Sequence, residues 1–372
     1  MEDLKDQQVD ASARVDLTEL EKDDFSGLKD LCIKHVPFWA SVSRGQIRVK
    51  LMAQVLTNRL YRADLMEGDS VLHSLIVKRF NVFGSVINNA DTQIETFELL
   101  GENDLGPRIF YRFRDVIIQE FIVGNTLERL SLLNLSCLTS MASELARFHK
   151  SATAIAPPHW DRNPVVLRTV NTWLPEARKV VEANGNFLDI DGLERKVGEF
   201  RAILDAHLKA SDSYANKVLF CHNDLYYKNL LNTPHGVRLI DFDYAGFNYV
   251  GAEVAKVIDQ LDIQYMEDDD DIVEYDVIGV TDEMKAIFAG IYLSEALEKN
   301  VLPSDEMVKD FLTSVRIHTL GSALFWSLWG LLMLGQPVSV LNVPQAFYRQ
   351  YSKLFLKYYD DVLSGLKKDG LV

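Results

Sequence analysis

The chain has 372 residues, a length typical of two domains or lobes and ample for a sizeable core. Its 39 Lys and Arg residues against 54 Asp and Glu residues give a formal charge of −15, which disfavours a general surface for nucleic acid or anionic membranes. Any polyanionic ligand must therefore be held by a local basic site. The three cysteines, Cys32, Cys137 and Cys221, lie far apart in sequence, which favours a reducing, intracellular setting.

We expect no segment of this sequence to insert into a membrane. The first 20 residues are polar and acidic, without the apolar run of a signal peptide or anchor. The most apolar stretch, Leu320–Leu334, is shorter than the roughly 18 residues expected of a spanning helix, so it predicts a buried helix. We therefore expect a cytoplasmic protein that does not insert into a membrane.

The N-terminal third predicts a small lobe built on a sheet. Residues 1–24 are charged and poor in aromatics, which predicts a polar tail or a surface helix. Three β-like runs between residues 46 and 80 predict an antiparallel sheet. Thr92–Glu95 has the spacing of a capping box and predicts a helix that ends near Gly101. With two further strands in RIFYRF and VIIQEFIV, residues 25–124 are expected to form this lobe.

The remainder, residues 125–372, is predicted to be a mainly helical second lobe. Apolar residues at spacings of three and four predict a helix that ends near His149, and further helices are expected at about 282–298, 304–334 and 342–366. Between them, the runs VLFC and VRLID predict a hairpin with functional residues at its ends. The fold class is therefore α+β, with an antiparallel-sheet lobe holding one helix and a larger helical lobe.

The segment HNDLYYKNLL carries the strongest chemical signal. Asp224 and Asn229 are separated by four residues, the spacing of a protein-kinase catalytic loop. In that loop the Asp accepts or orients the hydroxyl proton of the nucleophile, and the Asn supplies an amide oxygen to magnesium. Asp241 lies 17 residues beyond Asp224, at the end of an apolar strand where the second metal ligand belongs. Either segment alone could be a turn or a strand edge, but their order and spacing together favour an active site.

Three further residues fit this chemistry. His222 could brace the loop or shuttle a proton, and bracing is favoured. Lys78, at the end of a predicted strand, and Glu95, on the helix that follows, are placed to form the lysine–glutamate pair of kinases. Arg79 is the alternative to Lys78, but successive strand residues face opposite sides, and we choose Lys78. A solvent-facing lysine on an edge strand is the competing interpretation.

Aromatic residues near the C-terminus predict a pocket for a cation. Trp326 and Trp329 lie three positions apart, on one face of the expected helix. A quaternary ammonium is best held by aromatic faces, each worth about 0.5–2 kcal/mol. Core packing would be the favoured interpretation without the upstream motifs. With them, we predict that the two tryptophans form a wall of the pocket, joined by Tyr244 and Tyr265.

These segments resemble the choline/ethanolamine kinase family, relatives of aminoglycoside phosphotransferases and protein kinases. The resemblance runs in order through LTNRLYRADL, DTQIE, FCHNDLYYKNLL, LIDFDYAGFNY and LFWSLWGLL, over about residues 40–355. It implies a two-lobed protein-kinase-like fold with ATP between the lobes. It also implies ATP- and Mg²⁺-dependent transfer of the γ-phosphate to the hydroxyl of choline and/or ethanolamine, giving phosphocholine or phosphoethanolamine for phospholipid synthesis.

The resemblance assigns roles residue by residue. Asp224 would be the catalytic base, and Asn229 and Asp241 would bind magnesium. Lys78 would contact phosphate, and Glu95 would position that lysine. The remaining nucleotide contacts would come from Asn58 in the LTN segment and, around adenine, from backbone groups at Glu120, Phe121 and Ile122.

The sequence also departs from the family pattern. Paired glycines that usually precede LTN are replaced by Ala53 and Gln54, which weakens the expected approach of backbone amides to phosphate. Glu253 is expected to replace one family carboxylate, and Asp259 the acidic residue beside the amine pocket.

Two other functions therefore stay open. One is a pseudokinase that binds nucleotide or a partner without phosphotransfer, against which the intact carboxylates argue. The other is a kinase for a different acceptor, of the aminoglycoside or homoserine type. The residues do not decide between choline and ethanolamine, and the family often forms homodimers, although no interface can be recognised in this sequence.

Overall fold

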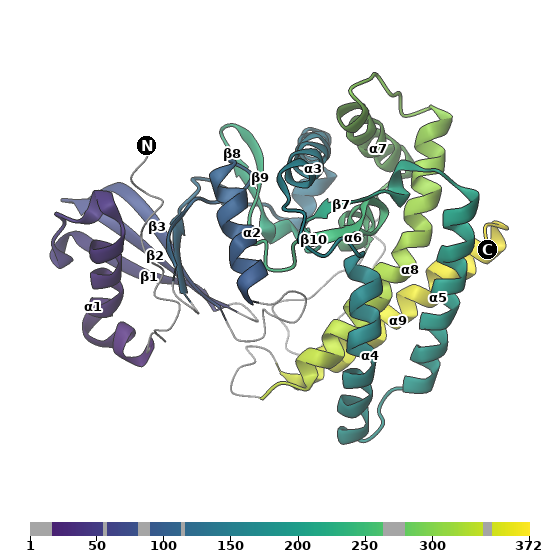
Figure 1. Cartoon of the computed structure of the whole chain (residues 1–372), viewed down its shortest axis with the longest axis horizontal. Helices are drawn as coiled ribbons and strands as arrows, with labels where there is room; N and C mark the ends of the chain where they lie inside the picture. The colour runs from purple at the N-terminus through teal and green to yellow at the C-terminus, as the bar shows by residue number, and fades with distance from the viewer. Residues whose placement is uncertain (1–16, 55–57, 81–89, 113–115, 263–279, 338–343) are drawn as a thin grey trace. The chain divides into compact units, whose positions relative to one another are not determined.

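The chain divides into two compact units, Met1–Val123 and Gly124–Val372. The computed structural model describes residues 17–54, 58–80, 90–112, 116–262, 280–337 and 344–372 (Figure 1). Tyr265, predicted to join the cation pocket, lies outside the described residues.

The first unit is built on a sheet whose paired strands are all antiparallel, as predicted. In spatial order the strands are β1-β2-β3-β5-β4. Their bounds are β1 Ile47–Gln54, β2 Asn58–Glu67, β3 Ser70–Phe80, β4 Ile109–Arg112 and β5 Val116–Glu120. β2 and β3 form a tight hairpin, and Gly68 at its turn has a φ of 59°, a left-handed conformation that glycine adopts without strain.

Helices cover both faces of this sheet (Figure 1). On one face, Leu28 and Cys32 of α1 (Leu17–His35) share a buried core with Val77 of β3. On the other, the next residue, Lys78, places its Nζ 5.4 Å from the ring centroid of Phe97 in α2 (Ala90–Glu102). Two short 3-10 turns, η1 (Pro37–Trp39) and η2 (Arg44–Gln46), connect α1 to β1. Because α1 begins at Leu17, the expected end of the polar tail at residue 24 falls inside a helix.

The structure corrects the predicted start of α2. The helix already begins at Ala90, so Thr92 is not its N-cap. The capping-box spacing could not locate the start, because Thr is also tolerated inside a helix once its neighbours favour one. The predicted end near Gly101 is confirmed, and a Cβ on Gly101 would lie 2.6 Å from the carbonyl oxygen of Pro107. Glycine therefore allows the returning chain to pass close to the helix end.

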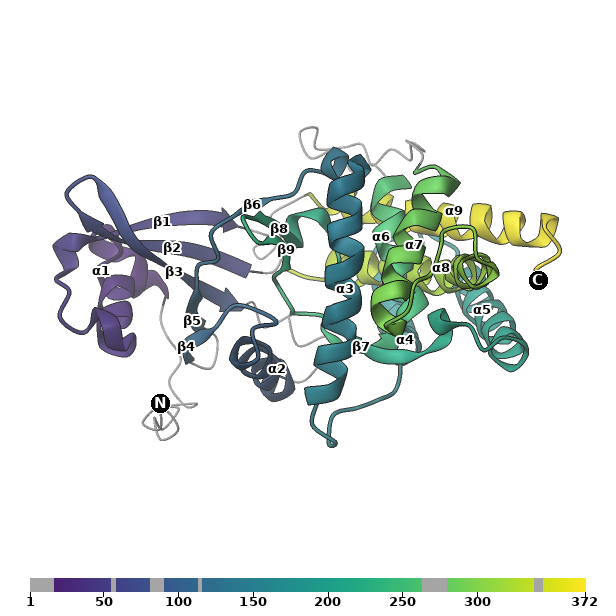
Figure 2. The same cartoon turned by 90° about the horizontal axis from the view of Figure 1, so that it is seen from above.

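The second unit is mainly helical, as predicted. Its helices are α3 Leu135–Ile155, α4 Val165–Ala183, α5 Ile190–Ala210, α6 Val250–Asp262, α7 Asp282–Leu297, α8 Glu306–Leu334 and α9 Gln345–Lys368, with 3-10 turns η4 Arg129–Leu133, η5 Tyr214–Asn216 and η6 Tyr227–Asn229. Figure 2 shows α3 and α7 side by side. The central helix α8 packs against α4, α5, α6, α7 and α9.

Helix α8 is long and apolar enough to cross a membrane by length and composition, but 94% of its most apolar window is buried inside the protein. The prediction of a buried helix over Leu320–Leu334 is therefore confirmed. A further prediction was wrong: α3 does not end near His149 but continues to Ile155. No Pro or Gly stands between these two positions, and the first residue that breaks a helix is Pro157.

The strands of this unit pair differently from the prediction. β7 (Val218–Cys221) pairs with β10 (Gly246–Tyr249), while β8 (Leu230–Thr233) and β9 (Gly236–Leu239) form the hairpin and β6 (Asn125–Thr126) joins β8. The predicted pairing of VLFC with VRLID is therefore wrong. The turn between Thr233 and Gly236 pairs GVRL with the LLNT run instead. The polar residues directly before LLNT made this run hard to recognise as a strand. As a result, the loops that follow β7 and β9 lie together.

Candidate active site

The loop after β7 holds Asp224 and Asn229 in contact. Asn229 Nδ2 donates to the Asp224 carboxylate at 3.0 Å and to its carbonyl oxygen at 2.9 Å. The backbone N–H of Ile240 donates to the Asn229 carbonyl at 3.0 Å, which ties this loop to the one after β9. The structure therefore brings the predicted base and the predicted amide ligand together.

Asp241, the third predicted residue, lies in the loop after β9 and acts on Asp224 electrostatically. Burial raises the pKa of Asp224; the charge of Asp241 adds to this effect, and the charges of Lys256 and His222 oppose it. Asp241 has a φ of 67°, an uncommon left-handed conformation for a non-glycine residue and one that often marks a functional site. Two neighbouring carboxylates and an amide provide the hard oxygen donors that Mg²⁺ prefers, so the residues fit such an ion.

His222 is engaged through both ring nitrogens. Nε2 lies 2.8 Å from the carbonyl oxygen of Ile240, and Nδ1 accepts the backbone N–H of Asp224 at 3.3 Å. The ring thus connects the two loops through the backbone. This geometry is that of a positioning residue and does not offer a nitrogen for proton transfer.

Asn223 is a site residue that the sequence reasoning missed. Its Nδ2 donates to the carbonyl oxygens of Tyr244 at 3.0 Å and Gly246 at 3.1 Å, and its Oδ1 accepts from Asn248 Nδ2 at 2.8 Å. Its φ of 65° is left-handed, a conformation that Asn tolerates better than most residues. The only sequence signal was an Asn directly before the predicted base.

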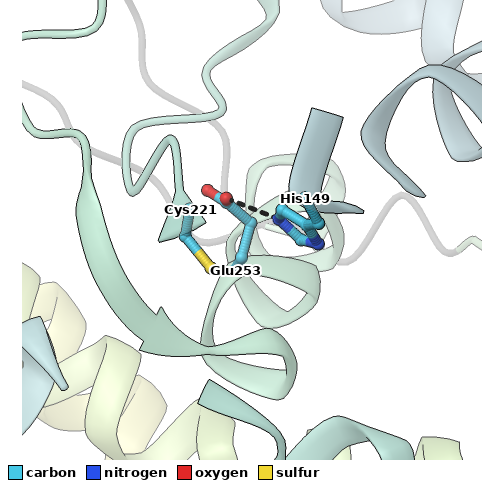
Figure 3. A group of neighbouring side chains, drawn as sticks. All are labelled: His149, Cys221 and Glu253. Atoms are coloured by element: carbon cyan, nitrogen blue, oxygen red, sulfur yellow. Dashed lines mark hydrogen bonds and ion pairs between the residues drawn. The ribbon is translucent and has the colours of Figure 1, made fainter. Parts of the chain in front are cut away.

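A buried carboxylate binds the backbone of the loop after β7 and pairs with a histidine (Figure 3 shows Glu253 and His149). Glu253 in α6 accepts the backbone N–H groups of His222 and Asn223 at 2.6 Å each, and His149 Nε2 lies 3.0 Å from its Oε2. Burial raises the pKa of Glu253, but hydrogen bonds and charge, from His149 above all, outweigh burial and hold the pKa below its ordinary value. Glu253 is therefore an ionised anchor for the backbone around Asp224.

The cluster of His149, Cys221 and Glu253 brings its potential ligand atoms within 4.8 Å of one another (Figure 3). A metal does not fit it well. Burial raises the pKa of Cys221 far above its ordinary value, whereas a metal needs the thiolate. His149 Nδ1 lies 2.7 Å from the hydroxyl of Tyr292, so both of its ring nitrogens already have partners. We interpret the cluster as structural support. In the sequence, His149 is marked only by its place near the predicted end of a helix.

The predicted aromatic wall forms within the second unit. Trp326 and Trp329 have ring centroids 5.8 Å apart, and Trp329 Nε1 donates to the hydroxyl of Tyr244 at 2.8 Å. The rings of Tyr244 and Trp326 have centroids 6.2 Å apart. Burial raises the pKa of Tyr244, so its hydroxyl stays protonated. The structure thus brings three of the four predicted aromatic residues together.

A lysine that the sequence reasoning missed lies on this wall. Lys256, one turn after Glu253 in α6, places its Nζ 3.7 Å from the ring centroid of Trp326 and is only 4% exposed. Asp259, one turn further, is buried and accepts the hydroxyls of Ser322 at 3.0 Å and Tyr358 at 2.7 Å. A small pocket beside them is lined by Asn223, Asn248, Lys256, Ser322, Phe325 and Trp326.

In the first unit, Lys78 lies in β3 between Leu60 of β2 and Ile117 of β5 and is buried. Its contact with Phe97 brings it to α2, where Glu95 lies two residues before Phe97. Arg79, the alternative, faces the other side of the strand and is half-buried. The expected partners, Lys78 and Glu95, therefore lie on β3 and α2, which contact each other at Phe97.

The residues expected to contact the nucleotide lie at strand ends. Asn58 is the first residue of β2, and nothing of its side chain is described. Glu120 ends β5, and its carboxylate accepts the backbone N–H of Arg108 at 3.1 Å. Phe121 lies beneath the guanidinium of Arg62, 4.2 Å from ring centroid to Cζ, and Ile122 is half-buried. Their contacts with adenine stay a prediction.

Comparison with solved structures identifies a kinase-like fold. The structure of choline kinase from Cryptosporidium parvum Iowa II aligns with a TM-score of 0.79 at 23% identity, over 93% of this chain and 97% of that one. The GDP complex of wild-type aminoglycoside 2'-phosphotransferase-IIIa aligns with a TM-score of 0.52 at 11% identity, over 91% and 98% of the two chains. The predicted fold class is confirmed.

Sequence comparison narrows this class to one family. The model for "Choline/ethanolamine kinase" matches residues 49–359. A "Probable choline kinase 1" of Arabidopsis thaliana is 25% identical over 301 residues, which cover 79% of this chain and 82% of the relative. The chain therefore belongs to the choline/ethanolamine kinase family, and the predicted resemblance is confirmed.

Proposed function

We propose that the chain transfers the γ-phosphate of ATP to the hydroxyl of a small alcohol. One observation carries the proposal: Asp224, Asn229 and Asp241, from two loops, form one connected group. Asp224 accepts the hydroxyl proton as the acceptor oxygen bonds to the γ-phosphorus, while the bond from that phosphorus to the bridging oxygen breaks and releases ADP. A pKa raised towards the working pH makes Asp224 a better proton acceptor than an ordinary carboxylate.

In this proposal Asn229 and Asp241 hold Mg²⁺, which when bound neutralises phosphate charge. Asn229 also holds the Asp224 carboxylate through its amide nitrogen, so one side chain orients the base and offers its oxygen to the ion. Lys78, with Glu95 beside it on α2, would contact phosphate, as in other kinases. The binding of nucleotide is also supported by the family to which the chain belongs.

Family membership favours choline or ethanolamine as the acceptor, with phosphocholine or phosphoethanolamine as the product for phospholipid synthesis. The ring faces of Trp326 and Trp329 support the same acceptors, because aromatic faces attract ammonium groups. A cytoplasmic location and a homodimer stay predictions.

A second acceptor class is favoured by one observation. Lys256 already places an ammonium over Trp326, which favours an alcohol without a positive charge. The pseudokinase hypothesis has less support, because the groups that catalysis needs lie together. Asp224 accepts a hydrogen bond from Asn229 and interacts electrostatically with Asp241.

The test is acceptor-dependent formation of ADP by the purified full chain with ATP and Mg²⁺. We expect Asp224→Asn to lower kcat by about 100- to 10,000-fold, the usual contribution of a general base, because the amide cannot accept the proton. Asp212→Asn, on an exposed loop, is the matched control and should leave kcat unchanged. Near-normal turnover by Asp224→Asn would exclude the assigned role, and ADP formation that no acceptor stimulates would favour the pseudokinase.

A further inference from the structure

A protein side chain already occupies one face of Trp326, a residue of the predicted cation site. The Nζ of Lys256 lies 3.7 Å from the ring centroid of Trp326, the distance at which a bound ammonium would sit on an aromatic face. The side chain is 4% exposed and reaches the site from α6, while Trp326 belongs to α8. Both helices pack against each other, so this contact is held by the core of the second unit.

The charges around Lys256 match a resident cation. Burial holds the pKa of Lys256 below its ordinary value, while the charges of Asp224 and Asp259 oppose this effect and favour the ammonium form. Asp259 is itself fixed by the hydroxyls of Ser322 and Tyr358, so it cannot turn freely towards another cation. The face of Trp326 and the charges of Asp224 and Asp259 are therefore already engaged with Lys256.

We infer that Lys256 determines acceptor specificity: its ammonium takes the place of the head group of a cationic alcohol, so the preferred acceptor is uncharged. This inference rests on the proposed phosphotransfer. A cationic head group approaching this face of Trp326 would meet the ammonium of Lys256 at close range. An anionic head group would meet two carboxylates, Asp224 and Asp259, against one ammonium.

An uncharged head group suits the other pocket residues. Ser322 gives its proton to Asp259, so its oxygen can accept a hydrogen bond, and the Lys256 ammonium can donate one. Phe325 and Trp326 supply apolar surface on the remaining side. The acceptor hydroxyl would be presented to Asp224, which acts on Lys256 electrostatically and is therefore close to the same pocket.

The first test compares choline with its uncharged carbon isostere, 3,3-dimethyl-1-butanol, which has the same shape around the quaternary centre. With the wild-type chain, ATP and Mg²⁺, we expect kcat/KM for the isostere to exceed that for choline by about tenfold or more. Ethanolamine should follow choline. A wild-type preference for choline or ethanolamine over the isostere would overturn the inference.

The second test removes the resident charge. Lys256→Met keeps a long apolar side chain, and we expect the ratio of kcat/KM for choline to kcat/KM for the isostere to rise by about tenfold or more. Lys256→Gln provides a second variant if the first is poorly folded. Lys217→Met is the matched control, because Lys217 is an exposed lysine whose Nζ lies 4.4 Å from the ring centroid of Tyr214, away from the pocket. A purely structural Lys256 would leave the ratio of the two acceptors unchanged, which contradicts the inference.

A binding measurement separates this inference from the proposed function. Choline should quench tryptophan fluorescence in Lys256→Met at concentrations that leave the wild-type signal unchanged, whether or not phosphate is transferred. Absence of ADP formation with every acceptor would refute the phosphotransfer, and the binding result would still decide the role of Lys256. Equal quenching by choline in the wild type and in Lys256→Met would refute the inference alone.

Discussion

Among the buried charged residues of helix α6, Glu253 and Lys256 have opposite signs, lie three positions apart and are held in different ways. Glu253 is enclosed by directional hydrogen bonds from two backbone N–H groups and a histidine. Lys256 lies on the face of an aromatic ring and near two carboxylates that act through their charge. Hydrogen bonds to a backbone fix one geometry, whereas a ring face accepts any ammonium of suitable size. Glu253 therefore fixes the backbone of the loop, whereas Lys256 is suited to selecting a ligand.

The largest stability effect is expected on the Glu253 side of this comparison. Glu253→Ala should lower the free energy of unfolding by about 3–5 kcal/mol, because it leaves the N–H groups of His222 and Asn223 buried without a carboxylate. Urea denaturation measures the change. Glu199→Ala, a carboxylate in a partly exposed ion pair with Lys367, is the control and should cost at most about 1 kcal/mol. Similar losses in both variants would show that the buried hydrogen bonds of Glu253 contribute no more than a partly exposed ion pair.

The pH dependence of stability gives a second test of Glu253. Its pKa in the folded chain lies below the ordinary value of 4.5, so the unfolded chain binds more protons in this range. The contribution of Glu253 is therefore fully present above pH 4.5 and is lost as the pH falls through the lower folded pKa. Unfolding measured between neutral and acidic pH should show this decline, and Glu253→Gln should make it shallower. An unchanged slope in Glu253→Gln would exclude Glu253 as its source.

Lys256 should matter much less for stability. Lys256→Met loses a contact with Trp326 worth about 1–2 kcal/mol but also removes the cost of burying a charge, so we expect a net change within about 1 kcal/mol. The same urea series as for Glu253→Ala provides the measurement. A loss as large as that of Glu253→Ala would indicate that both charges are structural and would weaken the contrast between them.

The smallest effect is expected at Thr92. Because α2 begins at Ala90, Thr92→Ala removes no N-cap and should change the free energy of unfolding by at most about 0.5 kcal/mol. Loss of a true Thr cap would cost about 1 kcal/mol. Asn134→Ala is the comparison, because Asn134 does cap α3, with its side chain accepting the backbone N–H of Ser136 at 2.9 Å. Thr92→Ala should therefore be the milder of the two.

The sequence predicted those parts of the site whose chemistry depends on local spacing. Asp224 and Asn229 lie within one short loop, and Asp241 ends the next strand, so their order alone indicated a common site. The sheet of the first unit was predictable for a similar reason, because short turns separate successive β-like runs in the sequence.

The remaining contacts join residues far apart in the chain, and no local pattern marks them. His149 meets Glu253 across 104 positions, and Lys256 meets Trp326 from another helix. The pairing of β7 with β10 was missed because a complete hairpin is inserted between them. The role of a lysine in an apolar helix such as α6 also cannot be predicted from the sequence alone. It depends on the aromatic ring that the fold places next to it.

The inserted hairpin has a practical consequence. The Ile240 to Asn229 hydrogen bond closes its base, and its turn lies at Pro234 and His235, both exposed. Because this turn lies at the opposite end of the hairpin from that hydrogen bond, we expect it to tolerate a foreign tag or a longer connection. A chain labelled there should keep Asp224 and Asn229 in contact, so it could be followed in cells or attached to a surface.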